Sequence, residues 1–236
     1  MIKFFRKIRQ NLLMENKTGK YFKYAIGEII LVVIGIVIAL QLNIAQQNRS
    51  DQKKLNKYLS LFLEDLEKDK LSINECIELD SLKALNCAQY INGNTMRMNH
   101  STLKYAAQKA SIIIHDATYT SMKSNGIMEL IENVETQKAI SEYYAYVEEV
   151  KRQEDQHLNT QYSNFLKEII NTKRLVQFYH HMHTNADFID LTKEEDAMLF
   201  GYIVHFRDIS NLEVGRYKNL LNKLEELNEL LTKEQI

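Results

Sequence analysis

The sequence contains no proline, no tryptophan, only seven glycines and only two cysteines in 236 residues. Proline and glycine interrupt helices more strongly than other residues do, so their scarcity allows long helices to run unbroken. If Cys76 and Cys87 lie in one helix, they are roughly 16 Å apart along its axis. A disulfide does not tolerate that separation. We therefore expect two free, buried thiols, even in an oxidising compartment.

Motifs that carry catalysis or nucleotide binding are also missing from the sequence. It contains no GxSxG, HExxH or CxxC pattern and no phosphate-binding GxxxxGK[ST] or GxGxxG loop. Residues 46–236 carry 23 basic and 29 acidic residues, a net charge of −6, whereas nucleic-acid binding favours a basic surface. We expect a protein that is not an enzyme, uses no cofactor and does not bind nucleic acid.

The sequence does contain one long apolar run, from Tyr24 to Ala45 (YAIGEIILVVIGIVIALQLNIA). Between positions 25 and 45 its strongly polar residues are Glu28, Gln41 and Asn43. About 21 helical residues cover roughly 31 Å, which is close to the hydrocarbon thickness of a bilayer. In lipid the backbone must pair its hydrogen bonds within the segment, and this requires a helix. We therefore predict a transmembrane helix over residues 24–45.

Basic residues dominate one flank of this segment. Seven Lys and Arg residues precede it, against one acid, Glu15. The positive-inside rule therefore predicts that residues 1–23 are cytoplasmic and that residues 46–236 lie outside the membrane, in a periplasm. A cleaved signal peptide is the main alternative, but the apolar run is too long and the basic leader too extended for one. The leader is amphipathic, and it either lies on anionic lipid or only sets the topology.

Beyond the membrane segment, apolar residues recur at helical spacing. Between Leu55 and Ile73 the spacing predicts one long amphipathic helix over residues 48–91, continuous with the membrane helix and ended by Asn92-Gly93-Asn94. Further helices are predicted over residues 101–114, 117–127, 175–183 and 217–231. A long helix is predicted from Glu135 to about Ile169, with an exposed polar tip at 151–157. Another is predicted from Thr192, which forms a capping box with Glu195, to about Arg207.

No part of the sequence shows convincing strand alternation. The helical patterns together predict an all-α fold, in which a single N-terminal transmembrane helix is followed by an elongated extracytoplasmic helical bundle. Heptad spacing of leucines over residues 217–231 predicts that the long helices are coiled-coil-like.

Three stretches of the sequence recur together in a known group of proteins: MIKFFRKIRQNLL, YAIGEIILVVIGIVIALQLN and TYTSMKSNGIMELI. With a basic aromatic leader, a GEIILVVIGI-type span and a later T/S-S-x-K-S-x-G segment, the chain resembles a large family of short single-span membrane proteins from Bacteroidota. That family is known only as a domain of unknown function. The resemblance is close over the first 45 residues and loose over the rest. It implies a bacterial inner-membrane location and brings no activity, cofactor or catalytic residue.

Glu28 is the first candidate for a functional residue within the span. An acid inside a bilayer costs free energy, so it either marks a function or lies at the headgroup boundary beside a lysine. Gly35 and Ala39 have the small-xxx-small spacing that lets two helices approach closely. We therefore name Glu28, Gly35 and Ala39 as intramembrane or interface candidates.

Histidines gather near position 180. In a helix, His180, His183 and Asp187 would share a face and offer ligands to a metal ion. The spacing resembles no established zinc motif. We therefore predict no metal site and keep these three residues only as weak candidates.

The predicted function is protein–protein association, as a homo-oligomer or as an accessory subunit of an envelope complex, in contact with membrane lipid. Two alternatives remain open. One is a periplasmic ligand-sensing module, whose ligand the sequence does not identify and whose output would need a partner because residues 1–23 are too short to hold one. The other is an oligomeric ion pathway that uses Glu28.

Overall fold

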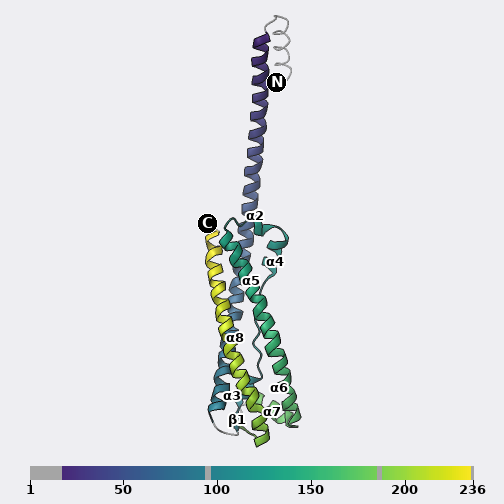
Figure 1. The fold of residues 1–236 in the computed structure, drawn as a ribbon, viewed down its shortest axis with the longest axis vertical. Helices are drawn as coiled ribbons and strands as arrows, with labels where there is room; N and C mark the ends of the chain where they lie inside the picture. The colour runs from purple at the N-terminus through teal and green to yellow at the C-terminus, as the bar shows by residue number, and fades with distance from the viewer. Residues whose placement is uncertain (1–17, 94–96, 185–187, 235–236) are drawn as a thin grey trace. The chain divides into compact units, whose positions relative to one another are not determined.

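The computed structural model describes residues 18–93, 97–184 and 188–234, and these residues are mostly helical (Figure 1). The chain divides into two compact units, Met1–Lys54 and Leu55–Ile236, and each is described by itself. Most of the predicted basic leader, residues 1–17, lies outside the described residues. Helix α2 (Thr18–Asn92) begins in the first unit and ends in the second.

The first unit contains the apolar part of α2. Large apolar side chains from Phe22 to Ile44 are exposed on all sides of the helix. Among the described residues, this is the helix whose length and composition allow it to cross a membrane. The predicted helix over residues 24–45 is therefore confirmed as a helix, and so is its continuity with the amphipathic helix predicted over 48–91.

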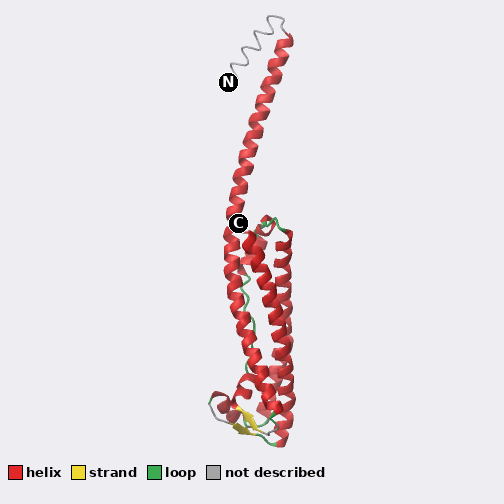
Figure 2. Cartoon of the chain, turned by 90° about the vertical axis from the view of Figure 1, so that its left-hand side faces the viewer, coloured by secondary structure: helices red, strands yellow, loops and turns green. Residues whose placement is uncertain are grey.

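The second unit contains the rest of α2, two further long helices and several short elements (Figures 1 and 2). Helices α5 and α8 pack against each other. In chain order the elements after α2 are β1 (Arg97–Asn99), α3 (His100–Ala106), α4 (Ala117–Ser124), η1 (Ile127–Leu130), α5 (Val134–Glu154), η2 (Asp155–Asn159), α6 (Thr160–Asn171), α7 (Leu175–His183), β2 (Phe188–Asp190) and α8 (Lys193–Glu234).

Local sequence sets several of these helix ends. The Thr192 hydroxyl accepts a hydrogen bond from the N–H of Glu195, whose carboxylate accepts one from the N–H of Thr192, so the predicted capping box opens α8. After α4, Gly126 adopts φ +67°, a left-handed conformation that glycine takes without steric cost. Asn133 caps α5 by accepting a hydrogen bond from the N–H of Glu135. The end of the short helix predicted near Asn125-Gly126 is confirmed.

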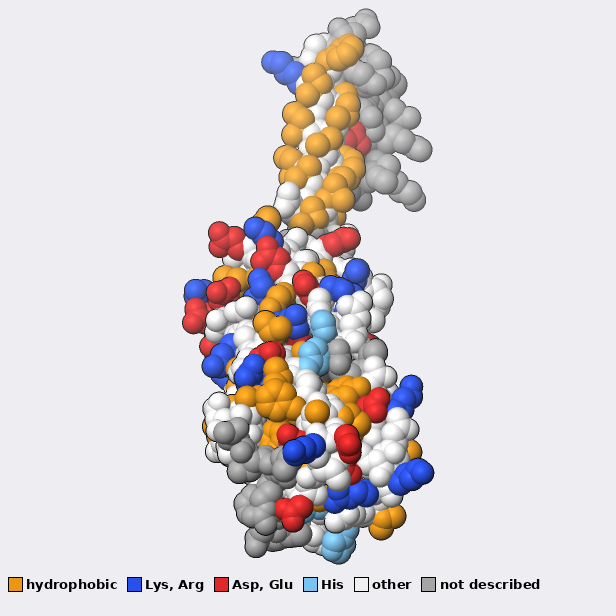
Figure 3. Space-filling view, turned by 60° about the horizontal axis from the view of Figure 1, so that its bottom comes forward, with side chains coloured by type: hydrophobic (Ala, Val, Ile, Leu, Met, Phe, Trp, Pro, Cys, Tyr) orange, Lys and Arg blue, Asp and Glu red, His pale blue; other side chains and the backbone are white. Residues whose placement is uncertain are grey.

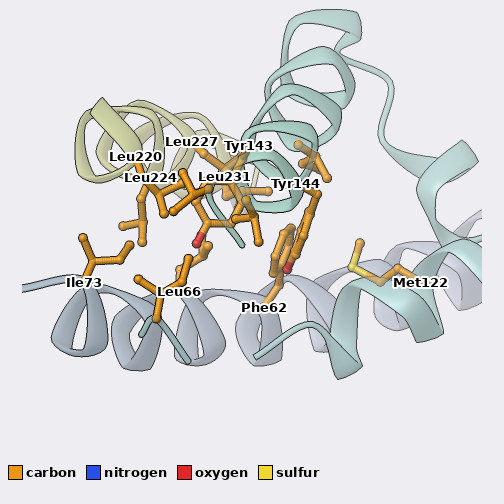
Figure 4. Close-up of a cluster of buried hydrophobic side chains, with 14 of the residues drawn as sticks. Phe62, Leu66, Ile73, Met122, Tyr143, Tyr144, Leu220, Leu224, Leu227 and Leu231 are labelled. Atoms are coloured by element: carbon orange, nitrogen blue, oxygen red, sulfur yellow. The ribbon is translucent and has the colours of Figure 1, made fainter. Parts of the chain in front are cut away.

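One hydrophobic cluster joins α2, α5 and the C-terminal half of α8 (Figure 4). The predicted heptad positions of the last helix, Leu220, Leu224, Leu227 and Leu231, are fully buried in it. They point toward α2 and α5, so this stripe packs inside the chain. Cys76 also lies in this cluster as a free, buried cysteine.

A second hydrophobic cluster lies around the N-terminal half of α8. It combines buried residues of α3, α6 and α7, such as Leu103, Phe165 and Phe178, with Phe206 of α8. Cys87 of α2 is buried here as the second free cysteine. The two cysteines lie in different clusters on one continuous helix. The prediction of two free, buried thiols is confirmed.

The structure differs from the sequence predictions in three helices. Helix α3 ends at Ala106 instead of continuing to position 114, and residues 108–116 form no regular element. The helix predicted to end near Arg207 continues without a break to Glu234 as α8. The predicted exposed polar tip after Val150 is wrong at Glu154, which is buried, although the chain continues helically through η2 into α6.

A short antiparallel pair of strands was not predicted. Met98 of β1 pairs with Ile189 of β2, and both side chains are buried in the second cluster. Each strand has three residues, too few to show the alternation by which strands are recognised in a sequence.

Candidate functional site

The intramembrane candidates lie on the surface of α2 within the first unit. Glu28 is partly buried, whereas Gly35 and Ala39 are exposed. Apart from the neighbouring turns of its own helix, a methyl group added at Gly35 would meet no atom of the described residues within 4 Å. A second helix can therefore approach this face closely, and an interface through these residues remains a prediction.

The histidine candidates lie on α7. His180 and His183 are exposed, whereas Asp187 lies outside the described residues. The Nδ1 atom of His183 donates to the carbonyl oxygen of Tyr179 at 2.8 Å, and the centroids of the two rings are 4.2 Å apart. Within the described residues, no three His, Cys, Asp or Glu side chains are grouped so that they could hold a metal ion. His181 between them is buried, and its burial lowers the pKa of the imidazole.

Buried carboxylates, which the sequence did not reveal, dominate the polar interior of the second unit. Asp69 of α2 is fully buried and accepts three hydrogen bonds. The donors are the backbone N–H of His115 at 2.7 Å, the His115 Nδ1 atom at 3.0 Å and the Tyr143 hydroxyl at 3.0 Å. Asp69 therefore connects α2 to α5 and to the irregular segment 108–116.

Glu154, at the end of α5, makes a second connection of the same kind. Its carboxylate accepts hydrogen bonds from the Ser111 hydroxyl at 2.9 Å, the backbone N–H of Ile112 at 3.0 Å and the Tyr217 hydroxyl at 2.7 Å. Between these contacts, the N–H of Ile113 donates to the Ser72 hydroxyl at 2.8 Å. Segment 108–116 is thus held by backbone hydrogen bonds to side chains of α2 and α5.

Two further acids are buried where α2 meets α8. Asp80 accepts a hydrogen bond from the Ser210 hydroxyl at 3.0 Å and lies 3.9 Å from the ammonium of Lys83. Glu213 pairs with Arg216. Within the described residues, the second carboxylate oxygens of Asp80 and Glu213 are buried and accept no hydrogen bond.

Burial governs the ionisation of these four acids. It raises the pKa of Asp69, Asp80, Glu154 and Glu213, because a charged carboxylate loses solvation in the interior. The hydrogen bonds and basic neighbours lower the pKa and offset only part of that effect. Asp69, Asp80 and Glu154 each bond to another element, so these carboxyls connect α2, α5, α8 and segment 108–116.

A solvent-open hollow lies elsewhere, between α3, α6 and α7. It has a volume of about 420 Å³. Ala107, Tyr162, Leu166, Leu175 and Tyr179 provide its apolar wall. Lys104, Gln108 and His183 add polar groups to the same wall. The histidine-bearing helix predicted from the sequence therefore contributes to a concave surface, although His180 does not line it.

Comparison with known proteins adds no relative. No protein-family model, no curated protein and no solved structure matches the chain.

Proposed function

We propose that the chain is a membrane-anchored protein of the bacterial inner membrane that acts by associating with other proteins. In this proposal α2 crosses the bilayer near its N-terminus, residues 1–23 are cytoplasmic and residues 46–236 form an elongated periplasmic helical bundle with coiled-coil-like long helices. The association is with further copies of the chain or with a larger envelope complex.

The apolar part of α2 supports the membrane placement. Its large side chains are about half exposed or more, and Figure 3 shows hydrophobic side chains along this helix. Exposing such an apolar surface to water costs free energy, whereas the hydrocarbon of a bilayer accommodates it. The seven basic residues before the run support a cytoplasmic N-terminus.

Exposed apolar residues on α7 are the observation on which the proposed association rests. Val176 is 82% exposed and Tyr179 is 59% exposed, and they are three positions apart on one side of the helix. The neighbouring Leu175 is also exposed, at 41%. Figure 3 shows hydrophobic side chains gathered between charged ones on the second unit. Exposed apolar groups that cluster in this way mark surfaces that bind other proteins.

Site-specific photocrosslinking in intact cells tests this proposal. A benzophenone amino acid placed at position 176 should give a discrete crosslinked species, whereas the same residue at the exposed position 226 of α8 should not. The variant Val176→Glu should abolish the species formed from a photocrosslinker at position 175, because a carboxylate cannot be buried in an apolar contact without a partner.

Mass photometry of the full chain in lipid nanodiscs distinguishes the two kinds of association. A homo-oligomer gives a mass that is a multiple of the chain and that Val176→Glu reduces. An accessory subunit gives a crosslinked species of one defined, larger partner. A strictly monomeric chain with no crosslink at position 176 would contradict the proposal.

Membrane topology has a separate test. Protease added to spheroplasts should degrade residues 46–236 and leave the N-terminal segment protected. Resistance of the C-terminal part to protease would contradict the periplasmic placement without bearing on the association.

A further inference from the structure

The hollow between α3, α6 and α7 has the chemistry of a small-molecule site. Its volume of about 420 Å³ is within the range of pockets that bury small ligands. The wall combines the aromatic rings of Tyr162 and Tyr179 with the aliphatic side chains of Leu166 and Leu175. Such a wall favours an apolar or aromatic molecular body.

The polar groups of the hollow are basic or neutral. Lys104 and His183 line it, together with the amide of Gln108, and no acid is among its described lining residues. None of the ion pairs within the described part of the chain includes Lys104, whose ammonium lies 5.7 Å from the centre of the Tyr105 ring. An ammonium without an acidic partner is suited to bind an anion that a ligand brings.

His183 is oriented for the same role. A carbonyl oxygen accepts only, so the Nδ1 atom of His183 carries the proton that it donates to the Tyr179 carbonyl. This bond and the contact with the Tyr179 ring hold the imidazole in place, and Nε2 is the nitrogen that remains for a second partner. In the neutral ring Nε2 accepts a hydrogen bond, whereas in the imidazolium both nitrogens carry a proton and Nε2 donates to an anion.

We propose that this hollow binds a small monocarboxylic acid with an aromatic or branched aliphatic body. The body packs between Tyr162, Leu166, Leu175 and Tyr179, and the carboxylate accepts hydrogen bonds from the Lys104 ammonium and from the imidazolium form of His183. The site goes beyond the proposed protein association: it shares Leu175 and Tyr179 with the exposed surface of α7 on which that association rests, but Val176 does not line it.

The test uses the full chain in lipid nanodiscs and a fluorinated phenylbutyrate as the probe, followed by ¹⁹F NMR titration. The matching fluorinated phenylbutanol has the same body without the charge, and empty nanodiscs correct for partition into lipid. The acid should bind saturably at one site per chain. The alcohol should bind at least about tenfold more weakly, since it lacks the charge-assisted hydrogen bonds.

Variants assign the binding to the hollow. Lys104→Met should weaken binding of the acid at least about tenfold, whereas Lys104→Arg should keep it within about threefold, because it preserves the charge. Lys167→Met is the matched control, since Lys167 is an exposed lysine of α6 outside the hollow, and it should leave the affinity unchanged. His183→Leu should weaken binding, whereas His180→Leu should not. Far-UV circular dichroism checks that each variant keeps its helices.

Three results would overturn the proposal: no saturable binding of the acid, equal binding of the acid and the alcohol, or an unchanged affinity in Lys104→Met. A short peptide ending in phenylalanine presents the same carboxylate on a protein chain. If this peptide binds while the free acid does not, the small-molecule assignment is wrong. The crosslinking at position 176 does not depend on any of these results, so failure of one proposal is distinguishable from failure of the other.

Discussion

The backbone N–H of His115 donates a hydrogen bond to the Oδ1 atom of Asp69 at 2.7 Å, although the two residues are 46 positions apart. The same carboxylate also accepts bonds from the His115 ring and from the Tyr143 hydroxyl. One buried side chain of α2 therefore fixes both an irregular segment and helix α5.

Removing this carboxylate should destabilise the second unit. Asp69→Ala leaves buried donors without an acceptor, and we expect a loss of about 2 to 5 kcal/mol in the free energy of unfolding. Guanidinium titration of the full chain measures this loss, and hydrogen exchange should show faster exchange of the His115 amide. Glu67→Ala, at an exposed position of the same helix, should change the stability by less than about 0.5 kcal/mol. Equal stability of the two variants would contradict the role given to Asp69.

The Tyr217 hydroxyl makes a comparable contribution from α8. It donates to the buried carboxylate of Glu154 at 2.7 Å. Tyr217→Phe keeps the ring and removes this bond, so a loss of about 1 to 3 kcal/mol is expected in the same titration. Tyr179→Phe is the control, because Tyr179 is 59% exposed and its loss of a hydroxyl should not affect unfolding. If both variants unfold at the same denaturant concentration, the Glu154 bond contributes no net stability.

The buried carboxyl of Glu213 should make the free energy of unfolding depend on pH. Burial raises the pKa of its carboxyl in the folded chain, whereas the unfolded value is about 4. The stability that this group contributes is therefore fully present below about pH 4 and is lost as the pH rises through the raised folded value. Glu213→Gln cannot ionise and has no such loss. The stability of this variant relative to the wild type should thus increase between about pH 4 and pH 8.

The comparison is best made from melting temperatures of both proteins at each pH, since other titrating groups then cancel. Glu226→Gln, at an exposed position of α8, is the matched control and should differ from the wild type by the same amount at every pH. A Glu213→Gln difference that stays constant or reverses with pH would show that burial does not raise the pKa of this carboxyl in the folded chain.

Two glycines should respond to alanine in opposite directions. Gly126 has φ +67°, so Gly126→Ala should cost about 1 to 2 kcal/mol. Gly215 lies inside α8, and an added methyl group there meets no atom within 4 Å, so Gly215→Ala should gain about 0.5 to 1 kcal/mol. Thermal unfolding of the two variants, monitored by circular dichroism, measures both changes. Melting temperatures that move in the same direction would refute the assigned backbone conformations.

Helices with strong local signals were predicted well from the sequence. The apolar spacing, the Thr192–Glu195 capping box and Gly126 are short-range features, and α2, α4, α7 and the start of α8 follow them. The leucine stripe of α8 was also found, because burial of one helix face leaves a regular pattern. Gly215 lies between Arg207 and Tyr217, but no proline does, and α8 continues through this stretch.

The irregular segment 108–116 could not be predicted in this way. Its alanine and three isoleucines fit a helix, but its amides bond to Asp69, Glu154 and Ser72, which are distant in the sequence. Glu154 lies in a run of polar residues that resembles a solvated surface, but it is buried where α5 meets α8 and segment 108–116. The hollow could not be predicted for the same reason, since its lining residues come from three helices that are separate in the sequence.

Because segment 108–116 is held by hydrogen bonds from its main chain, many different side chains should be tolerated there. At position 113 the amide bonds to Ser72 while the isoleucine side chain is 67% exposed to solvent. Every genetically encoded residue except proline offers the same N–H group at that place. In natural variants, position 113 should therefore accept any residue except proline. Ser72, whose hydroxyl accepts the bond, should tolerate far fewer replacements.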